Sequence, residues 1–143
     1  MIKYDDLYKD VQQLLSARRF KHTVLVVERA VEYALIYHVS EDVVKLTALA
    51  HDIAKEMSKE EIDKYLLDNN LEFDDVEKVN ANLLHAKIGA DICEKKYGFT
   101  EDMVNAIRYH TTGREDMSIL EKIIYLADAT EKSRKFCSKR TVE

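Results

Sequence analysis

Apolar residues recur at intervals of three or four positions along most of the 143-residue chain. This interval places them on one face of an α-helix. The chain contains no proline and only three glycines, so it has few of the residues that form tight hairpins between strands. The pattern therefore predicts an all-α fold, a helical bundle of about six or seven helices. We expect these helices over residues of about 4–17, 20–38, 41–56, 59–70, 82–97, 101–110 and 119–133.

Polar residues at the predicted helix starts support these boundaries. Ser58 and Glu61 have the spacing of a capping box, and so do Ser118 and Glu121. The polar stretch "NNLEFDD", residues 69–75, interrupts the helical pattern. Further predicted boundary residues are the N-caps Ser40 and Thr100 and the C′ residue Gly98.

The composition, with 46% hydrophobic and 34% charged residues, fits one compact domain over residues 1–143. No window approaches the roughly 20 apolar residues that a membrane span needs, and the amino terminus lacks a basic region followed by an apolar stretch. Cys93 and Cys137 lie far apart without CxxC spacing, which indicates neither a disulfide framework nor a thiolate zinc site. We therefore expect a soluble, cytoplasmic protein with reduced thiols and no membrane partner.

The charge argues against a nucleic-acid polymer as partner. The formal net charge is -5 and the pI is near 5.6, whereas binding to phosphate backbones needs an excess of lysine and arginine. The segment "KSRKFCSKR", residues 132–140, differs because it holds five basic residues and no acidic one. We interpret this basic tail, about residues 132–143, as solvated.

One apolar segment contains two polar residues that need an explanation. The stretch "LTALAHDIAKEM" reads as the buried face of a helix, yet it places His51 and Asp52 side by side. Burial of an ionised carboxylate without a partner costs many kcal/mol. Asp128, in "IIYLADATE", raises the same question. Both carboxylates require a partner that neutralises them.

The histidines supply the rest of a candidate site. His38 ends its predicted helix, where an imidazole complements the helix dipole, so a cap or surface role fits it. Each of the others, taken alone, fits a satisfied core or boundary histidine. Together they bring imidazoles from four helices to apolar surroundings, and a divalent cation would accept these nitrogens and neutralise both aspartates. These histidines are His22, His51, His85 and His110.

The ligand set indicates the kind of metal. The chain has neither an H-E-x-x-H helix nor a C-x-x-C finger. Four imidazoles and two carboxylates exceed what tetrahedral zinc needs, and they suit iron, manganese or a related transition metal at two neighbouring positions. Adjacent residues on a helix point about 100° apart, so His51 and Asp52 can flank one ion while a carboxylate oxygen bridges to a second.

Cationic side chains accompany these residues. Each of three cations lies three or four residues from a candidate ligand. Arg19 precedes His22, and Lys55 follows His51. Arg114 follows His110 across a Thr-Thr-Gly loop. Lysine and arginine around a metal pair suit phosphoryl chemistry, because the transition state concentrates charge on non-bridging oxygens. A solvated surface charge is an equal alternative for each of them.

The ordered pattern His22, His51-Asp52 and Asp128 resembles the H…HD…D signature of the HD-domain metal-dependent phosphohydrolases, an all-helical family. The strings around His85, "LLHAKIGA", and His110, "AIRYHTTGREDMSILEKIIYLAD", resemble its YqeK-type branch, described as symmetrical diadenosine tetraphosphate hydrolases with a di-iron-type centre. The resemblance covers about residues 15 to 131.

The resemblance implies roles for these residues. One metal would be held by His22, His51, Asp52 and Asp128, and Asp52 would bridge to a second metal held by His85 and His110. Arg19, Lys55, Thr111 and Arg114 would contact phosphates, with Asp52, Lys55 and Arg114 in the catalytic set. The cofactor would be two divalent transition-metal ions, with iron first and manganese, cobalt, nickel or zinc as alternatives.

The expected reaction follows from that centre. Two ions would share a water whose pKa falls toward neutrality, and the resulting metal-bound hydroxide would attack phosphorus in line. Diadenosine tetraphosphate would give two ADP. Alternatives are the same chemistry on another nucleotide, and a non-catalytic, metal-bearing nucleotide sensor.

One segment departs from the family. After the last aspartate, family members usually have Glu-Pro-x-Arg and further helices, whereas this chain reads "EKSR" at residues 131–134 and ends 15 residues after Asp128. A truncated or divergent end is therefore expected. A homodimer is left open, because the missing helices normally contribute walls or contacts.

Overall fold

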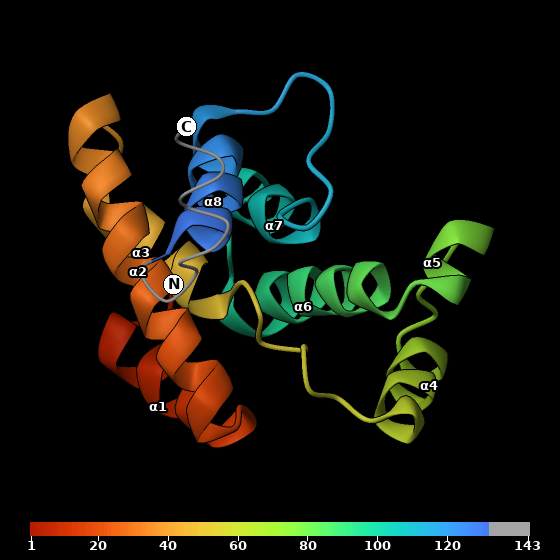
Figure 1. Ribbon diagram of the computed structural model, residues 1–143. Helices are drawn as coiled ribbons and strands as arrows, with labels where there is room; N and C mark the ends of the chain where they lie inside the picture. The colour runs from red at the N-terminus through yellow and green to blue at the C-terminus, as the bar shows by residue number, and fades with distance from the viewer. Residues whose placement is uncertain (132–143) are drawn as a thin grey trace.

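The computed structural model of the protein describes residues 1–131, and this range contains α-helices and no β-strand (Figure 1). The predicted all-α class is confirmed. The predicted basic tail lies outside the described residues. The eight helices of this range are α1 (Tyr4–Leu14), α2 (Ala17–Tyr37), α3 (Glu41–Ala50), α4 (Lys59–Asp68), α5 (Asp75–Val79), α6 (Ala81–Tyr97), α7 (Glu101–Arg108) and α8 (Ile119–Thr130).

The main body of the molecule is built around α2. Helices α3 and α8 both pack against α2, α1 packs against α3, and α7 lies between α6 and α8 (Figure 1). The apolar faces that periodicity predicted meet in this body, where Leu7, Val26, Leu49, Ile107 and Ile124 are fully buried. Burial of each such side chain favours folding by about 1.5–3 kcal/mol.

Two short helices lie apart from this body. Helices α4 and α5 pack against α6 at the side of the molecule opposite α1 to α3 (right in Figure 1). Only Ile62 of these two helices is buried, and Leu67, Val76 and Val79 are exposed. The α4–α5 unit is therefore held to the molecule through α6 and contributes little to the main core.

Helix α5 adds one helix to the predicted set. It begins where the polar stretch at residues 69–75 ends, and five residues are too few for a 3.6-residue period to be recognised in the sequence. Asp74 and Glu77 form a capping box that stabilises its start. An ion pair of 3.1 Å between Glu77 and Lys87 Nζ attaches it to α6.

The third helix ends earlier than the sequence predicted. We expected it over residues 41–56, but α3 ends at Ala50 and residues 51–56 form consecutive turns. In these turns the backbone N–H groups of Ile53 and Lys55 donate to carbonyls three residues back. Gly89 of α6 lies against this segment, since a Cβ atom there would be 3.4 Å from Ile53 Cγ2. The segment of residues 51–56, against which α6 packs closely, is thus wound more tightly than an α-helix.

The boundary between the first two helices also differs from the prediction of 4–17 and 20–38, because α1 ends at Leu14 and Ser16 caps an α2 that begins at Ala17. Local signals predicted several other boundaries. Both predicted capping boxes, which start at Ser58 and Ser118, are present at the starts of α4 and α8. Gly98 ends α6 with φ of 70° and His38 ends α2 with φ of 58°, both in the left-handed region. His38 is exposed there, as its predicted cap or surface role requires. Among the described residues, the helices are too short or too polar to cross a bilayer.

Candidate functional site

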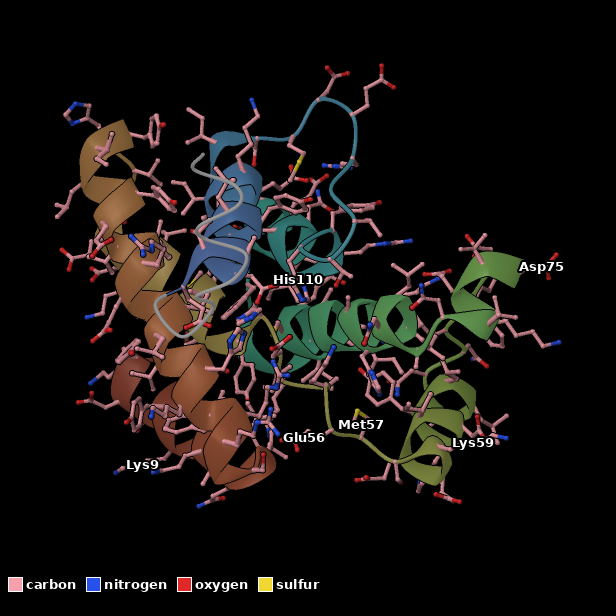
Figure 2. The ribbon with its side chains drawn as sticks, viewed as in Figure 1. Lys9, Glu56, Met57, Lys59, Asp75 and His110 are labelled. Atoms are coloured by element: carbon pink, nitrogen blue, oxygen red, sulfur yellow. The ribbon has the colours of Figure 1, made fainter. Side chains whose placement is uncertain are left out.

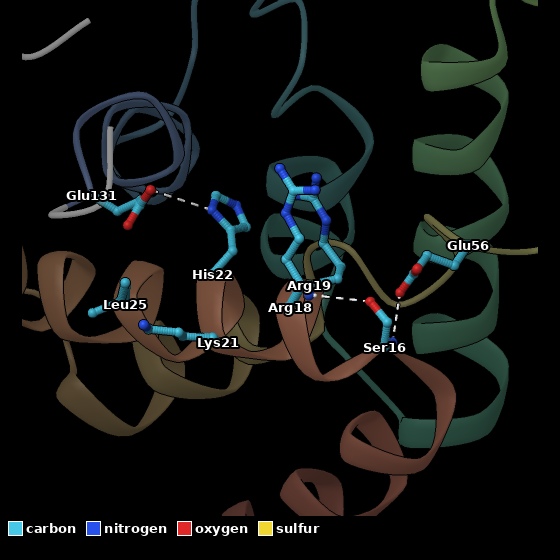
Figure 3. A pocket seen from close by; sticks show the side chains of 8 residues that line it. All are labelled: Ser16, Arg18, Arg19, Lys21, His22, Leu25, Glu56 and Glu131. Atoms are coloured by element: carbon cyan, nitrogen blue, oxygen red, sulfur yellow. Dashed lines mark hydrogen bonds and ion pairs between the residues drawn. The ribbon is translucent and has the colours of Figure 1, made fainter. Parts of the chain in front are cut away.

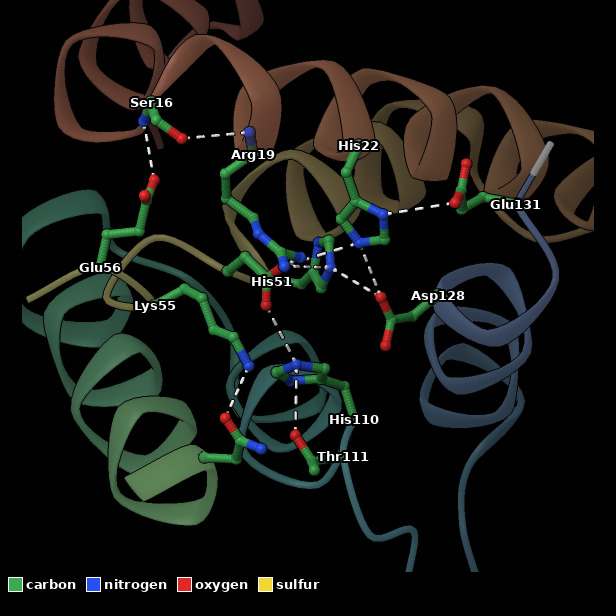
Figure 4. Close-up of polar contacts among 12 residues, drawn as sticks. Ser16, Arg19, His22, His51, Lys55, Glu56, His110, Thr111, Asp128 and Glu131 are labelled. Atoms are coloured by element: carbon green, nitrogen blue, oxygen red, sulfur yellow. Dashed lines mark hydrogen bonds and ion pairs between the residues drawn. The ribbon is translucent and has the colours of Figure 1, made fainter. Parts of the chain in front are cut away.

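Four predicted ligands converge in the main body. His22 comes from α2, His51 and Asp52 from the turn after α3, and Asp128 from the last turn of α8 (Figure 4). One ligand atom of each residue lies within 4.8 Å of the ligand atoms of the other three. Residues separated by up to 106 positions in sequence, as for the 2.9 Å contact of His22 Nε2 with Asp128 Oδ1, therefore share one small volume.

The carboxylates of this group lie at unfavourable ends of their helices. Asp52 directly follows the C-terminal cap of α3, and Asp128 lies in the last turn of α8. Helix C-termini carry partial negative charge from unpaired carbonyls, so carboxylates there are destabilised. Three such termini, those of α3, α7 and α8, bring polar residues to this region. A bound cation would offset the combined negative charge.

His51 and His110 are oriented by the same contact. Each ring has Nδ1 2.6 Å from the carbonyl oxygen three residues earlier, of Ala48 and of Ile107 respectively. An Nδ1–H that donates to a carbonyl leaves Nε2 as the metal-binding nitrogen. Both Nε2 atoms face Asp52, at 3.3 Å from Oδ2 for His51 and 3.4 Å from Oδ1 for His110. The backbone therefore selects the tautomer that ligation requires.

Two buried nitrogens lack hydrogen bonds within the described part of the chain. His51 Nε2 lies 3.3 Å from carboxylate oxygens of Asp52 and of Asp128, yet it makes a hydrogen bond to neither. His85 Nδ1 is also buried without a hydrogen bond. Buried polar atoms are rarely left unsatisfied, because desolvation costs about 1–3 kcal/mol each. These atoms fit a metal that binds imidazole nitrogens.

His85 and His110 border a second, smaller space. A cavity of about 10 Å³ is lined by both histidines together with His51, Asp52 and Thr111. That volume is about one water molecule or one ion. Asp52 turns Oδ2 toward His51 and Oδ1 toward His110, so its two oxygens face both groups of histidines. His85 and His110 therefore border the same small cavity as His51 and Asp52, but they are not part of the four-residue group whose ligand atoms lie within 4.8 Å of one another.

Electrostatics within the group favour charged carboxylates. Burial alone would raise the pKa of Asp52, but His51 and His110 outweigh it and hold this pKa well below its usual range. Burial would also raise the pKa of Asp128, but contacts with His22 and His51 outweigh it and lower the pKa of that carboxyl. Burial would lower the pKa of His51, but the charges of Asp52 and Asp128 raise it to about 10. Both aspartates are therefore anionic at neutral pH.

The family model of the HD domain matches residues 19–133, a range that includes this whole constellation. The chain belongs to the HD domain family. The family predicted from the His and His-Asp pattern is confirmed, and the HD domain together with this cluster fits divalent metal binding.

Two bacterial relatives of this HD-domain chain share one name. The protein named symmetrical bis(5'-nucleosyl)-tetraphosphatase from Halalkalibacterium halodurans is 40% identical over 127 residues, which cover 88% of this chain and 67% of that protein. Its namesake from Bacillus subtilis is 38% identical over 136 residues, 88% of this chain and 68% of that protein. The crystal structure of a predicted HD superfamily hydrolase involved in NAD metabolism from Clostridium acetobutylicum has a TM-score of 0.89 at 36% identity, over 99% of this chain and 77% of that one.

Two predicted phosphate-binding cations, Arg19 and Lys55, lie beside the histidine and aspartate cluster of this HD domain. Arg19 Nη1 donates to Asp52 Oδ2 at 3.1 Å, and its side chain is 30% exposed. Lys55 lines the small cavity and donates from Nζ to Asn82 Oδ1 at 2.7 Å. Thr111 also lines the cavity, with Oγ1 3.4 Å from His110 Nε2. All three reach the space beside the predicted ligands (Figure 4).

Arg114 is placed differently. Its guanidinium donates from Nε and Nη2 to the two carboxylate oxygens of Glu121, at 2.8 and 3.1 Å, and stacks on Tyr109 at 4.4 Å. Glu121 is 2% exposed and also accepts from the Ser118 N–H. The pair with Glu121 therefore attaches the loop at residues 110–118 to α8, and Arg114 does not line the small cavity beside the histidine and aspartate cluster.

Sequence reasoning missed Glu131 and a cavity beside it. The Glu131 carboxylate is fully buried, with Oε1 3.5 Å from His22 Nδ1. The sequence signal was its position three residues after Asp128, which would put both on one side of the helix predicted over 119–133. In the structure Glu131 follows the end of α8 with an extended backbone. His22 and Glu131 line a cavity of about 680 Å³ together with Arg18, Arg19 and Lys21. Figure 3 shows these side chains around it. His22 therefore borders a cavity lined by three cationic residues and by the carboxylate residues Glu56 and Glu131.

Proposed function

We propose that this HD-domain protein is a metal-dependent phosphohydrolase that cleaves diadenosine tetraphosphate symmetrically into two ADP. The observation that carries the proposal is the group formed by His22, His51, Asp52 and Asp128, in which a buried imidazole nitrogen has no hydrogen bond. The names of the relatives from H. halodurans and B. subtilis support the choice of substrate.

The proposal assigns two divalent ions to the chain. His22, His51, Asp52 and Asp128 would hold one, and Asp52 would share the second with His85 and His110. The mixed nitrogen and oxygen ligands support iron first, with manganese, cobalt, nickel or zinc as alternatives. Burial lowers the pKa of His85, which favours the neutral imidazole that metals bind. The chemistry that such ions supply when bound is acidification of water and neutralisation of phosphate charge.

The side chains around the ligands would bind and orient the substrate. Arg19 and Lys55 would contact non-bridging phosphate oxygens, and Thr111 would donate its hydroxyl. These groups are already positioned beside the ligands, so the substrate would find them with little reorganisation. A phosphate contact by Arg114 would require its guanidinium to leave Glu121, and the two hydrogen bonds that join them favour a role in positioning the loop instead.

A small nucleotide would be the partner in the cytoplasm, where the free thiol of Cys93 stays reduced. A homodimer remains a prediction from the sequence.

The test is an assay of protein reconstituted with Fe²⁺ or Mn²⁺. We expect two ADP from each diadenosine tetraphosphate, and the Asp52→Asn variant to be slower by at least about 10²-fold. Metal analysis of protein purified without chelator should find about two ions per chain. Formation of ATP and AMP would contradict symmetrical cleavage. Binding of the dinucleotide without ADP above the level of Asp52→Asn would favour the nucleotide sensor.

A further inference from the structure

A mostly apolar cavity lies between α4, α5 and α6. Its volume is about 600 Å³, and its apolar walls include Ile62, Leu66, Phe73 and Leu84. Small-molecule sites usually have volumes of about 300–1,000 Å³ and apolar linings with a few polar groups. Figure 2 shows Met57 on the segment that leads to α4 and Lys59 at the start of α4, and both residues line the cavity. The cavity thus has the size and lining of a ligand site.

His85 connects this cavity to the candidate metal centre. The imidazole lines the 600 Å³ cavity and also the small cavity that His51, Asp52 and His110 border. Its Nε2 atom lies 3.4 Å from the carbonyl oxygen of Met57, which lines the same cavity. A molecule in the apolar cavity would therefore touch a residue that also borders the reacting phosphates. A part of the substrate that extends from the reacting phosphates could therefore occupy this cavity.

The polar groups at the cavity match a nucleotide. Lys59, Lys78 and Asp63 also line this cavity, whose other walls are largely apolar. Phe73 lines the cavity and leaves 43% of its surface exposed, so its ring is accessible to a ligand there. An aromatic face with neighbouring cations suits a purine base joined to a phosphate chain.

The walls of the cavity are fixed before any ligand binds. The Tyr65 hydroxyl donates to Asp91 Oδ2 at 2.7 Å, which joins α4 to α6. The ion pair of Glu77 with Lys87, whose side chains are each 13% exposed, joins α5 to α6. These contacts hold both short helices at the distance from α6 that keeps the cavity open. Such preorganisation reduces the cost of binding.

We infer that this cavity binds one nucleoside end of the substrate, with the base against Phe73 and Leu66 and the phosphate chain leading past His85. This inference rests on the proposed function, because it takes the reacting phosphates to lie at the histidine and aspartate cluster. It also gives the α4–α5 unit, which adds little to the main core, a role in substrate selection.

The experiment compares ADP with pyrophosphate, which lacks the nucleoside. Titration calorimetry of the metal-loaded protein is expected to show ADP binding tighter than pyrophosphate. Phe73→Ala should weaken ADP by about 5- to 100-fold, the usual range for a stacked base, and leave pyrophosphate unchanged. Phe73→Tyr should restore ADP binding. Val76→Ala is the matched control, because Val76 is 61% exposed on α5 and does not line the cavity.

Hydrolysis of diadenosine tetraphosphate gives a second measurement. For Phe73→Ala we expect KM to rise while kcat changes little, since Phe73 lines the apolar cavity and not the small cavity at the histidine and aspartate cluster. Equal ADP affinity of wild type and Phe73→Ala would overturn the inference, and so would an equal loss for ADP and pyrophosphate. If wild type fails to hydrolyse the dinucleotide but Phe73→Ala selectively loses ADP, the proposed function fails and the nucleoside site stands. If wild type and Phe73→Ala hydrolyse the dinucleotide equally well, the proposed function stands and the nucleoside site fails.

Discussion

At the residue scale, the protein orients its candidate ligands through contacts on the side of each ring that faces away from the cluster. Backbone carbonyls do this for His51 and His110, and a buried carboxylate, Glu131, does it for His22. Such outer contacts fix ring orientation and raise the basicity of the nitrogen that binds metal. Their loss should weaken metal binding even where no ligand is removed.

Glu131→Gln tests this expectation. The amide keeps the shape of the side chain but removes the negative charge beside His22 Nδ1, so we expect metal affinity to fall by about 10- to 100-fold. Metal titration monitored by calorimetry measures the change, and circular dichroism checks the fold. Glu32→Gln is the control, since Glu32 lies on α2, is 47% exposed and pairs only with Arg29 among the ion pairs of the described residues. Equal affinities in both variants would show that Glu131 does not act through His22.

Lys55→Ala is expected to act on substrate and not on metal. The Lys55 ammonium borders the small cavity but is not a metal ligand, so its removal should lower kcat/KM for diadenosine tetraphosphate by about 10²-fold. Metal content measured by elemental analysis should stay at the wild-type level. A parallel loss of metal would instead assign Lys55 to the stability of the centre.

At the element scale, the start of α8 depends on one carboxylate. Glu121 closes the capping box with Ser118 and accepts two hydrogen bonds from Arg114, which joins the loop at residues 110–118 to α8. Burial would raise the pKa of Glu121, but hydrogen bonds from Arg114 and Ser118 outweigh it and lower this pKa. The ionised carboxylate is therefore the form that stabilises the native state.

Arg114→Ala should lower the melting temperature, because it leaves the nearly buried Glu121 carboxylate without its cation. The stabilisation comes from a lowered folded-state pKa, so it is present above the ordinary value of 4.5 and is lost as pH falls through the folded-state value. We expect the difference in melting temperature between wild type and Arg114→Ala to shrink in acid. A difference that is constant with pH, together with a selective loss of catalysis, would support a phosphate contact for Arg114.

At the scale of the whole molecule, folding and metal binding oppose each other in their dependence on pH. In the metal-free protein the protonated His51 offsets the charges of Asp52 and Asp128, and its pKa is raised from 6.5 to about 10. A raised folded-state pKa gives stability that is fully present below pH 6.5 and is lost as pH rises through about 10. Metal needs the neutral imidazole, so its affinity should increase over the same range.

Scanning calorimetry with Mn²⁺ and with chelator tests this relation. Between pH 6.5 and 10 the metal-free melting temperature should fall while the increase caused by metal grows. A metal concentration of 100 times Kd would add about 2.7 kcal/mol to the free energy of unfolding. Calorimetric titrations in buffers of different ionisation enthalpy should detect proton release on binding. A metal effect that is independent of pH would contradict the expectation.

Local information in the sequence was enough for most of the helices and for the identity of the polar groups. Capping boxes at Ser58 and Ser118 marked helix starts because a cap involves residues only three positions apart. The buried aspartates were recognisable because an unpaired carboxylate among apolar residues is costly wherever it occurs. Periodicity failed at α5, which is shorter than two turns, and at the end of α3, where close packing of Gly89 accompanies the tighter turns.

The sequence by itself therefore determined which side chains need partners, since the helical period and the apolar residues around each polar one can be read from neighbouring positions. Only the tertiary structure decided which partners they meet. It brought Glu131 to His22, tied Arg114 to Glu121 and placed His85 between the small cavity and the apolar one. Contacts of this kind join residues on different elements, and they follow from how helices pack, which no local pattern specifies.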